Sequence, residues 1–279
     1  MLQNKRAGLT GTDLKTIALV LMVLDHIHYM FEFTGAVPVW FTMAGRLSAP
    51  LFLFCTAEGF AHTHDRKRYL LRIWGISSAM GLIEVLFMLG YFRRADGFWP
   101  RNGIFADFVL LCLVWQGIDW LRQHRCVRGI AVIAAVVLWP FAASLLCTVP
   151  ALSKPVAVLC QSLIPAWSNL TDGGVYYLIG GVILYLLRDH RPRQLACWAV
   201  WTFATELVLT GWLASGTPGF TFSMMFTDYF EWFSVFAVLL MAAYNGRRGA
   251  GHKQLFYWFY PAHVYLLYAA SCAVCRWMG

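Results

Sequence analysis

The sequence predicts an all-α polytopic integral membrane protein, with about nine or ten transmembrane helices in a single bundle. Of its 279 residues, 59% are hydrophobic and only 13% are charged, whereas roughly 25% are charged in an average soluble domain. The mean hydropathy is +0.59. Apolar runs of about 18 residues or more recur along the chain, and each can cross roughly 30 Å of hydrocarbon as a helix.

Short polar connections separate the apolar segments, and no repeat period or low-complexity tract is visible. This spacing favours one domain, residues 1–279, over two. No small-residue cleavage site follows the first apolar run, so we expect no removable signal peptide. The apolar segments lie at about 12–33, 39–61, 69–91, 102–120, 127–147, 150–165, 173–187, 194–213, 223–244 and 255–277.

The basic loops set the expected topology, because cytoplasmic loops are rich in Lys and Arg. The net charge of +8 therefore indicates anionic lipid and not nucleic acid. Segment 150–165 is short and bracketed by prolines, and if it does not cross, all the clusters below face the cytoplasm. We expect nine crossings, a cytoplasmic N-terminus, an outer C-terminus and a re-entrant or outer-surface segment at 148–172. The clusters are Lys5 and Arg6; Arg66, Lys67, Arg68 and Arg72; Arg122, Arg125 and Arg128; Arg188, Arg191 and Arg193; Arg247, Arg248 and Lys253.

One basic loop, residues 93–103, lies outside in this topology. It is either a recognition surface or a sign that the topology differs.

Ionisable side chains inside the apolar segments are the candidate functional residues, because each costs roughly 2.5–3.5 kcal/mol at membrane depth. Counted from the segment ends at about 1.5 Å per residue, several share one depth, slightly outward of the bilayer centre. This predicts one polar cavity. The alternative is a structural ion-pair network, which leaves the histidine unexplained. The residues at this depth are His26, Arg46, Glu84, Glu206 and Glu231.

Lys15 and His26 lie eleven residues apart, close to three helical turns, so they project from one helix face about 16 Å apart. Adjacent helical residues point about 100° apart, so Asp25 is poorly placed to orient His26. We expect Glu84 to partner His26, and Asp25 to pair with Arg46 instead.

His263 follows Pro261 in the last apolar segment and either lines the same cavity or packs in the core. His62 and His64 lie in a polar loop, where solvated side chains are the expected reading and a metal pair is the alternative. No metal site is expected.

Four stretches of the sequence carry a resemblance to a known family: DLKTIALVLMVLDHIHYMF (13–31), AGRLSAPLFLFCTAEGFAHTHDRKRYLLRI (44–73), RNGIFADFVL (101–110) and KQLFYWFYPAHVYLLY (253–268). Their most specific part is the combination of Lys15, Asp25, His26, Gly45, Arg46, Pro50, Phe52, Glu58, Gly59, Phe60, Tyr69 and Arg72. These motifs resemble the TraX family of membrane proteins, which are associated with acetylation of conjugative pilin at its N-terminus. The likeness covers the first 110 residues and the last helix, whereas about 125–220 resembles no family.

A wider resemblance is to the acyltransferase-3 family, whose members begin with a basic residue, ten intervening residues and a His. Lys15 and His26 reproduce this spacing, with Lys where Arg is more usual. FLFCTAEGF stands where that family often carries a Phe-rich Ser-Gly-Phe segment, with Glu58 replacing the serine. The resemblance implies an acyl-CoA donor on the cytosolic side and an acceptor on the other face.

The predicted function is a membrane-embedded acetyltransferase of the bacterial inner membrane. It moves an acetyl group from cytosolic acetyl-CoA to an extracytoplasmic amine or hydroxyl, which family likeness suggests is a pilin N-terminus. His26 is the predicted general base, and a covalent acetyl-His is the variant. Arg46 is predicted to bind the oxyanion or an acceptor carboxylate, and Lys15, Arg68 and Arg72 the CoA phosphates. The other cavity-lining candidates are Glu58, His263, Glu206 and Glu231.

Three other functions remain open. A secondary transporter or channel would use the buried charges of Arg46 and Glu84, although the sequence shows no matching interrupted helices in two halves. An O-acetyltransferase for cell-envelope glycans would share the donor but not the acceptor. A structural subunit would leave the deep His26 without a role. The sequence also leaves a longer acyl donor open.

Overall fold

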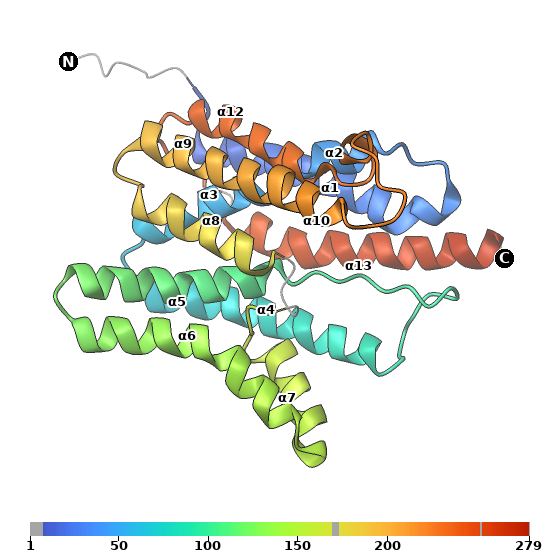
Figure 1. Ribbon diagram of the computed structural model, residues 1–279, viewed down its shortest axis with the longest axis horizontal. Helices are drawn as coiled ribbons and strands as arrows, with labels where there is room; N and C mark the ends of the chain where they lie inside the picture. The colour runs from blue at the N-terminus through green and yellow to red at the C-terminus, as the bar shows by residue number, and fades with distance from the viewer. Residues whose placement is uncertain (1–7, 169–172, 252, 279) are drawn as a thin grey trace. The chain divides into compact units, whose positions relative to one another are not determined.

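The computed structural model describes residues 8–168, 173–251 and 253–278, and the regular elements in these ranges are helical (Figure 1). The predicted all-α class is confirmed. Lys5, Arg6 and residues 169–172 lie outside the described residues, as does the side chain of Lys253. The helices are α1 (Gly11–Phe31), η1 (Glu32–Thr34), α2 (Trp40–Gly45), α3 (Ser48–Ala61), α4 (Arg66–Met88), α5 (Ile104–Arg122), α6 (Cys126–Cys147), α7 (Pro150–Ser162), α8 (Gly174–Leu186), α9 (Arg191–Thr202), η2 (Phe203–Leu209), α10 (Thr210–Ala214), α11 (Met224–Thr227), η3 (Phe230–Phe236), α12 (Ala237–Ala242) and α13 (Lys253–Met278).

Among the described residues, 5 helices are long and apolar enough to cross a membrane. Because they are spread along the chain, the protein is a polytopic membrane protein. The chain divides into two compact units, and the dividing points fall inside α3, α8 and α13. The spanning helices are Gly11–Thr34, Arg66–Met88, Ile104–Arg122, Cys126–Cys147 and Arg191–Ala214. The first unit holds Met1–Glu58 and Leu186–Ser271, and the second holds Gly59–Tyr185 and Cys272–Gly279.

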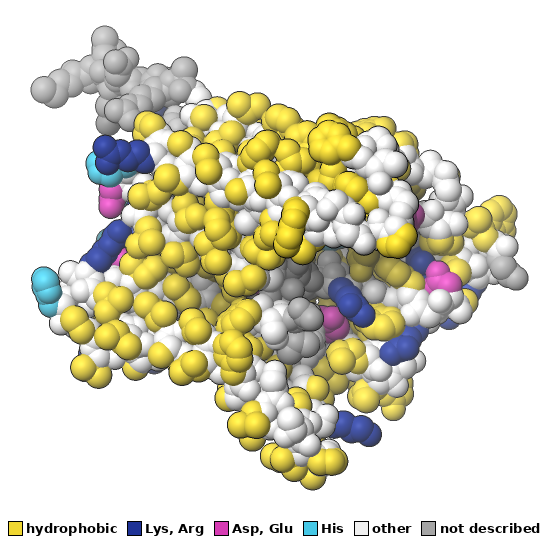
Figure 2. All heavy atoms as spheres, in the orientation of Figure 1, with side chains coloured by type: hydrophobic (Ala, Val, Ile, Leu, Met, Phe, Trp, Pro, Cys, Tyr) yellow, Lys and Arg dark blue, Asp and Glu magenta, His cyan; other side chains and the backbone are white. Residues whose placement is uncertain are grey.

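Large apolar side chains face outward from the helices of both units. Val127 is 83% exposed, Trp258 73% and Leu266 70%. Figure 2 shows hydrophobic side chains over the outward faces of α9 and α10 in the first unit and of α5 and α6 in the second. Such surfaces are stable against lipid, since water would oppose their exposure.

The N-terminal end of α1 is tied to the segment that precedes α13. The Thr10 side chain and Asp13 form a capping box at the start of α1. The Gly11 N–H donates to the carbonyl oxygen of Arg247 at 2.8 Å, and the Thr12 N–H to that of Arg248 at 3.0 Å. These bonds satisfy N–H groups that have no partner within the helix, so they hold the two segments at one end of the first unit.

α1 and α13 run parallel in the first unit. The Lys15 Nζ lies 5.9 Å from the centre of the Phe256 ring, and the His26 Nδ1 lies 2.7 Å from the His263 Nε2. Residue numbers therefore increase in the same direction along the two helices. If both helices cross one bilayer, the chain makes an odd number of crossings, which favours nine over ten.

Three of the expected single spans of the first unit are irregular helices. The run 39–61 forms α2 and α3, which break at Arg46 and Leu47. The run 194–213 contains the π-helix η2, which carries Glu206. The run 223–244 contains the 3-10 helix η3, which carries Glu231. Irregular backbone at membrane depth is tolerated where it is buried in protein or lines a cavity.

In the second unit, α5 and α6 form an antiparallel pair (Figure 1). Gly117 and Gly129 face each other, because a Cβ on Gly117 would meet the Gly129 carbonyl oxygen at 3.1 Å. Small residues allow this close packing in membrane helices. The Trp115 ring stacks on the Tyr185 ring at 5.0 Å, so α8 joins the same core.

α7 folds back along the C-terminal half of α6. The Cys147 Sγ lies 3.9 Å from the Ser153 carbonyl oxygen, and the Trp139 Nε1–H donates to the Ile164 carbonyl oxygen at 2.9 Å. By residue 164 the chain has therefore returned only to the level of Trp139, about 12 Å from the end of α6. α7 therefore extends only part of the way back along α6.

α8 runs beside α5 from the first turn of α5 to its last. The Gly173 N–H donates to Asp107 Oδ2 at 3.0 Å, in the first turn of α5, and the Tyr185 hydroxyl donates to Asp119 Oδ2 at 2.8 Å, in its last turn. Because α5 and α6 are antiparallel and Gly117 lies beside Gly129, Asp107 on α5 lies at the level of Trp139 on α6. The chain that follows α7 reaches this same level. α7 ends and α8 begins at the same level of the α5–α6 pair, so we expect them to make one interrupted crossing. The five long helices, α2–α3, α7–α8, η3–α12 and α13 together make nine candidate crossings in the described ranges.

Candidate functional site

Two buried histidines form the centre of the candidate site. The His26 Nδ1 of α1 lies 2.7 Å from the His263 Nε2 of α13, and the two side chains belong to residues only 8% and 7% exposed. Their ring centroids are 4.8 Å apart. We call this pair the histidine dyad.

His263 is held in place by its own helix. Its Nδ1 lies 2.9 Å from the Phe259 carbonyl oxygen, and its ring stacks on the Phe259 ring at 5.1 Å. The Tyr260 ring lies edge-on to both His26 and His263, at 6.3 and 5.5 Å. The aromatic rings of Phe259 and Tyr260 on α13 therefore pack against the histidine dyad.

Asp25 and Arg46 meet through Thr42. The Thr42 hydroxyl donates to Asp25 Oδ1 at 2.6 Å, and the Arg46 Nη2 donates to the Thr42 oxygen at 2.7 Å. The Arg46 Nη2 also lies 3.5 Å from Asp25 Oδ1. Since Asp25 is adjacent to His26 in α1, the Arg46 guanidinium lies at the level of the histidine dyad. The Arg46 Nε is buried and has no hydrogen-bond partner in the described structure.

Glu206 and Glu231 come near the same guanidinium. η3 packs against α2, α9 and η2, and the Arg46 guanidinium carbon lies 5.6 Å from the Phe230 ring centre. Glu206 lies within electrostatic range of Arg46 and Glu231. Four of the residues expected at one depth thus gather in the first unit: His26, Arg46, Glu206 and Glu231.

A second polar cluster lies nearer the N-terminal end of α1. The Arg191 Nη2 pairs with Glu58 Oε1 at 3.2 Å, and the Arg191 guanidinium carbon lies 4.6 Å from the Phe54 ring centre. Lys15 and Glu58 both lie within electrostatic range of the buried Cys55. Glu58 is therefore neutralised by Arg191, which was predicted only as part of a basic loop.

The remaining sequence-predicted site residues belong to the second unit. Glu84 of α4 lines a small hollow together with Asn102 and Gln161. Arg68 is exposed and pairs with Asp65 at 3.4 Å, and Arg72 is also exposed. The partnership of Glu84 with His26 and the joint use of Lys15, Arg68 and Arg72 stay predictions.

Two buried aspartates on α5 are not among the sequence-predicted site residues. Asp107 is fully buried and Asp119 is 6% exposed. The Arg66 Nη2 pairs with Asp119 Oδ2 at 2.7 Å, and the Tyr185 hydroxyl binds the same oxygen. The rule applied to the other apolar segments, that an acid at membrane depth marks a site, also applies to these two.

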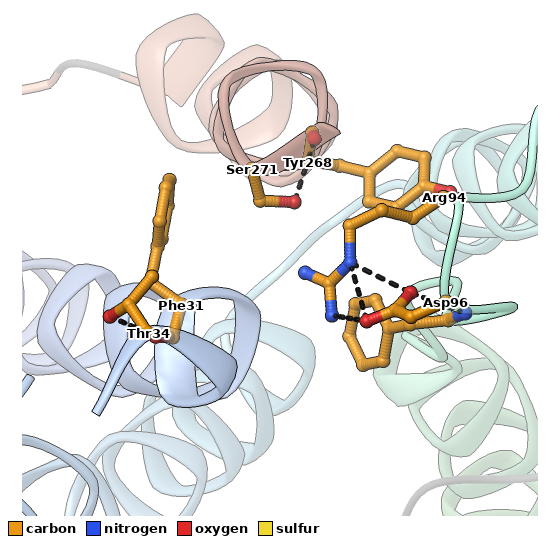
Figure 3. Close-up of polar contacts among 7 residues, drawn as sticks. Phe31, Thr34, Arg94, Asp96, Tyr268 and Ser271 are labelled. Carbon is orange, nitrogen blue, oxygen red and sulfur yellow. Dashed lines mark hydrogen bonds and ion pairs between the residues drawn. The ribbon is translucent and has the colours of Figure 1, made fainter. Parts of the chain in front are cut away.

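The basic loop 93–103 of the second unit is held together by its own side chains. The Arg94 guanidinium binds the Asp96 carboxylate through two nitrogens, with an Nη2–Oδ2 distance of 2.7 Å (Figure 3). This bond holds the pKa of Asp96 below its ordinary value. Arg93 donates to the carbonyl oxygens that end α4 and lies over the Trp99 ring at 4.3 Å.

These helices and their enclosed polar groups define a polytopic helical membrane protein with a buried histidine site. The chain belongs to the TraX family, whose family model, described as TraX protein, matches residues 10–271. The match includes every sequence-predicted site residue, from Lys15 to His263.

Three curated proteins illustrate the relationship. The chain is 32% identical to Protein TraX of Escherichia coli over 127 residues, 45% of this chain and 46% of that protein. It is 29% identical to Protein TraX of Escherichia coli strain K12 over the same shares. The chain thus matches about half the length of these two relatives. It is 24% identical to the probable fimbrial assembly protein FimC, serogroup H1, of Dichelobacter nodosus, over 96% of this chain and 98% of that protein. No solved structure matches the chain.

Proposed function

We propose that this protein is a membrane-embedded acetyltransferase that moves an acetyl group from cytosolic acetyl-CoA to an amine or hydroxyl on the other side of the membrane. His26 acts as the general base. The observation that carries the proposal is the histidine dyad, because a structural role does not require two hydrogen-bonded imidazoles at membrane depth. TraX family membership supports a pilin N-terminus as the acceptor.

The reaction balances without a further reactant. His26 takes the proton of the acceptor N–H or O–H, and the freed lone pair attacks the acetyl carbonyl carbon. The tetrahedral intermediate collapses as the C–S bond breaks. The leaving CoA sulfur takes the proton from His26, which gives the free thiol and restores the base. Each step needs only a positioned base and a donor for the oxyanion.

Arg46 is the proposed donor for the oxyanion or for an acceptor carboxylate. Its Nε is buried without a hydrogen-bond partner among the described residues, and such a donor gains free energy when a ligand supplies the acceptor. Glu206 and Glu231 complete the polar lining around it. Arg46 and His26 come from neighbouring elements of the same unit, as one reaction centre requires.

Lys15 is the proposed site for CoA phosphates. It lies three helical turns from His26 on one face of α1, about 16 Å toward the N-terminal end. A phosphate group bound there would leave the thioester to reach toward the histidine dyad. Arg68 and Arg72 add cations on the same proposed cytoplasmic side.

The test is release of free thiol from acetyl-CoA by the purified protein in detergent. We expect His26→Ala to lower turnover by roughly 10²–10⁴-fold and Lys15→Ala to raise the KM for acetyl-CoA. His28→Ala is the matched control, since His28 is also buried on α1 and has no role in the proposal. Wild-type protein that neither releases thiol nor gains thermal stability from CoA would exclude the proposed donor.

A second assay distinguishes the two possible acceptors. Labelled acetyl-CoA is offered with a peptide carrying a free N-terminus and with an envelope glycan. Label on the peptide supports the pilin-like acceptor, and label on the glycan supports O-acetylation.

A secondary transporter is the second candidate. The interrupted crossing of α7 and α8 and the π-helix η2 favour it, because broken helices are common at transport sites. A carrier would show no CoA-dependent thiol release and no CoA-dependent stabilisation. The same first assay therefore distinguishes the two functions.

A further inference from the structure

The protons of the histidine dyad can be assigned from its two hydrogen bonds. A carbonyl oxygen only accepts hydrogen bonds. The His263 Nδ1, which lies 2.9 Å from the Phe259 carbonyl oxygen, therefore carries a hydrogen. In the neutral imidazole the other nitrogen then has no hydrogen, so the His263 Nε2 is an acceptor.

This assignment also determines the proton of His26. The His263 Nε2 accepts, so the His26 Nδ1 at 2.7 Å must donate. His26 is neutral when its Nδ1 carries the only ring hydrogen, and its Nε2 then holds the basic lone pair. A chain of two bonds thus runs from the Phe259 carbonyl oxygen through His263 to His26.

We propose that His263 is the positioning residue of the site: it holds His26 in the Nδ1–H tautomer and so makes the Nε2 the nitrogen that takes the acceptor's proton. This inference rests on the proposed function for its catalytic consequence. When His26 gains a proton on Nε2, its Nδ1–H still donates to the His263 Nε2, so the bond persists and strengthens as charge develops. A neutral imidazole here fills the role that carboxylates fill in other acyl-transfer sites.

The surroundings of the dyad support a positioning role. The Phe259 ring stacks on His263 with an interplanar angle of 16°, and the Tyr260 ring packs edge-on against both imidazoles. The interior residues of α13 therefore restrict the His263 ring to one plane. A residue held this firmly can impose an orientation on its partner.

Two variants separate positioning from packing. His263→Leu removes the Nε2 acceptor and puts an apolar side chain in its place. His263→Gln keeps a carbonyl oxygen that can accept from the His26 Nδ1. In thiol release from acetyl-CoA we expect His263→Leu to lower kcat by about 10²-fold, with the KM for acetyl-CoA unchanged. We expect His263→Gln to recover at least tenfold of that loss.

The tautomer of His26 is a direct readout that needs no activity. Nitrogen-15 NMR of histidine-labelled protein in lipid bilayers separates protonated from unprotonated ring nitrogens, and a His26→Ala sample assigns the signals. We expect wild-type His26 to carry its hydrogen on Nδ1, and His263→Leu to shift it toward Nε2. If His263→Leu does not fold, the wild-type and His263→Gln spectra decide the question.

The outcomes distinguish this inference from the proposed function. Wild-type His26 with its hydrogen on Nε2, or equal kcat in His263→Leu and wild type, would overturn the positioning role. Absence of wild-type thiol release would refute the acetyltransferase instead, while the spectra would still show whether His263 sets the tautomer.

Discussion

Gly45 of α2 lies directly against the carboxylate of Asp25 on α1. A Cβ built on Gly45 would stand 2.8 Å from the Asp25 Cγ and closer still to its Cβ. Only a residue without a side chain permits this approach, and the approach in turn lets Thr42 and Arg46 reach the carboxylate. The glycine that precedes the arginine therefore belongs to the architecture of the charge cluster.

Gly45→Ala should consequently separate α1 from α2. We expect a loss of roughly 1–3 kcal/mol in the free energy of unfolding, as is typical of overpacking, together with lower activity because Arg46 is displaced. Thermal unfolding in detergent measures the first effect. Gly75→Ala is the control, since a Cβ on Gly75 meets nothing within 4 Å. Equal melting temperatures for Gly45→Ala and wild type would contradict the close contact.

Asp119 is buried and forms an ion pair with the partly buried Arg66, which should stabilise the second unit. We expect Asp119→Asn to lower the free energy of unfolding by about 1–3 kcal/mol, because the Arg66 guanidinium loses its charged acceptor. Tyr185→Phe removes one hydrogen bond to the same oxygen and should cost about 1 kcal/mol. Denaturant titration monitored by intrinsic tryptophan fluorescence measures both. A larger effect for Tyr185→Phe than for Asp119→Asn would refute this ranking.

The interrupted crossing predicts a pattern of chemical accessibility. With the native cysteines replaced, Lys154→Cys and Arg188→Cys should react with a membrane-impermeant maleimide from opposite sides of sealed vesicles. Ile164→Cys should react from neither side, since it lies at the level of Trp139 on α6. Reaction of Lys154→Cys and Arg188→Cys from the same side would show that α7 crosses fully.

The Asp96 and Arg94 pair predicts a dependence of stability on pH. The hydrogen bonds from Arg94 hold the pKa of Asp96 below its ordinary value of 3.8. A carboxyl whose pKa is lower in the folded state stabilises the fold above its unfolded pKa. That contribution disappears as the pH falls through the folded value. Wild type should therefore exceed Asp96→Asn in melting temperature at pH 7, and the difference should shrink below about pH 4. A constant difference across this range would argue against the pair.

Much of the membrane architecture is predictable from the chain alone. The length and hydropathy of segments such as 127–147 predict helices, because a backbone in lipid must satisfy its own hydrogen bonds. The prolines around 150–165 predict that this segment does not cross; α7 packs along the C-terminal half of α6, and the topology stays a prediction. The irregular geometry of η2 and η3 has no comparable signal, since neither element contains a proline.

The candidate site divides in the same way. Residue type and position within the apolar runs identify side chains that are costly at membrane depth, among them His26, Arg46, Glu206 and Glu231. The partners of these side chains follow only from the packing of the helices. His263 meets His26 across 237 positions of chain, and Arg191 of a basic loop meets Glu58. The position of a residue within its apolar run predicts its depth in the membrane. The residue that faces it depends on how the helices pack and rotate, which no local pattern encodes.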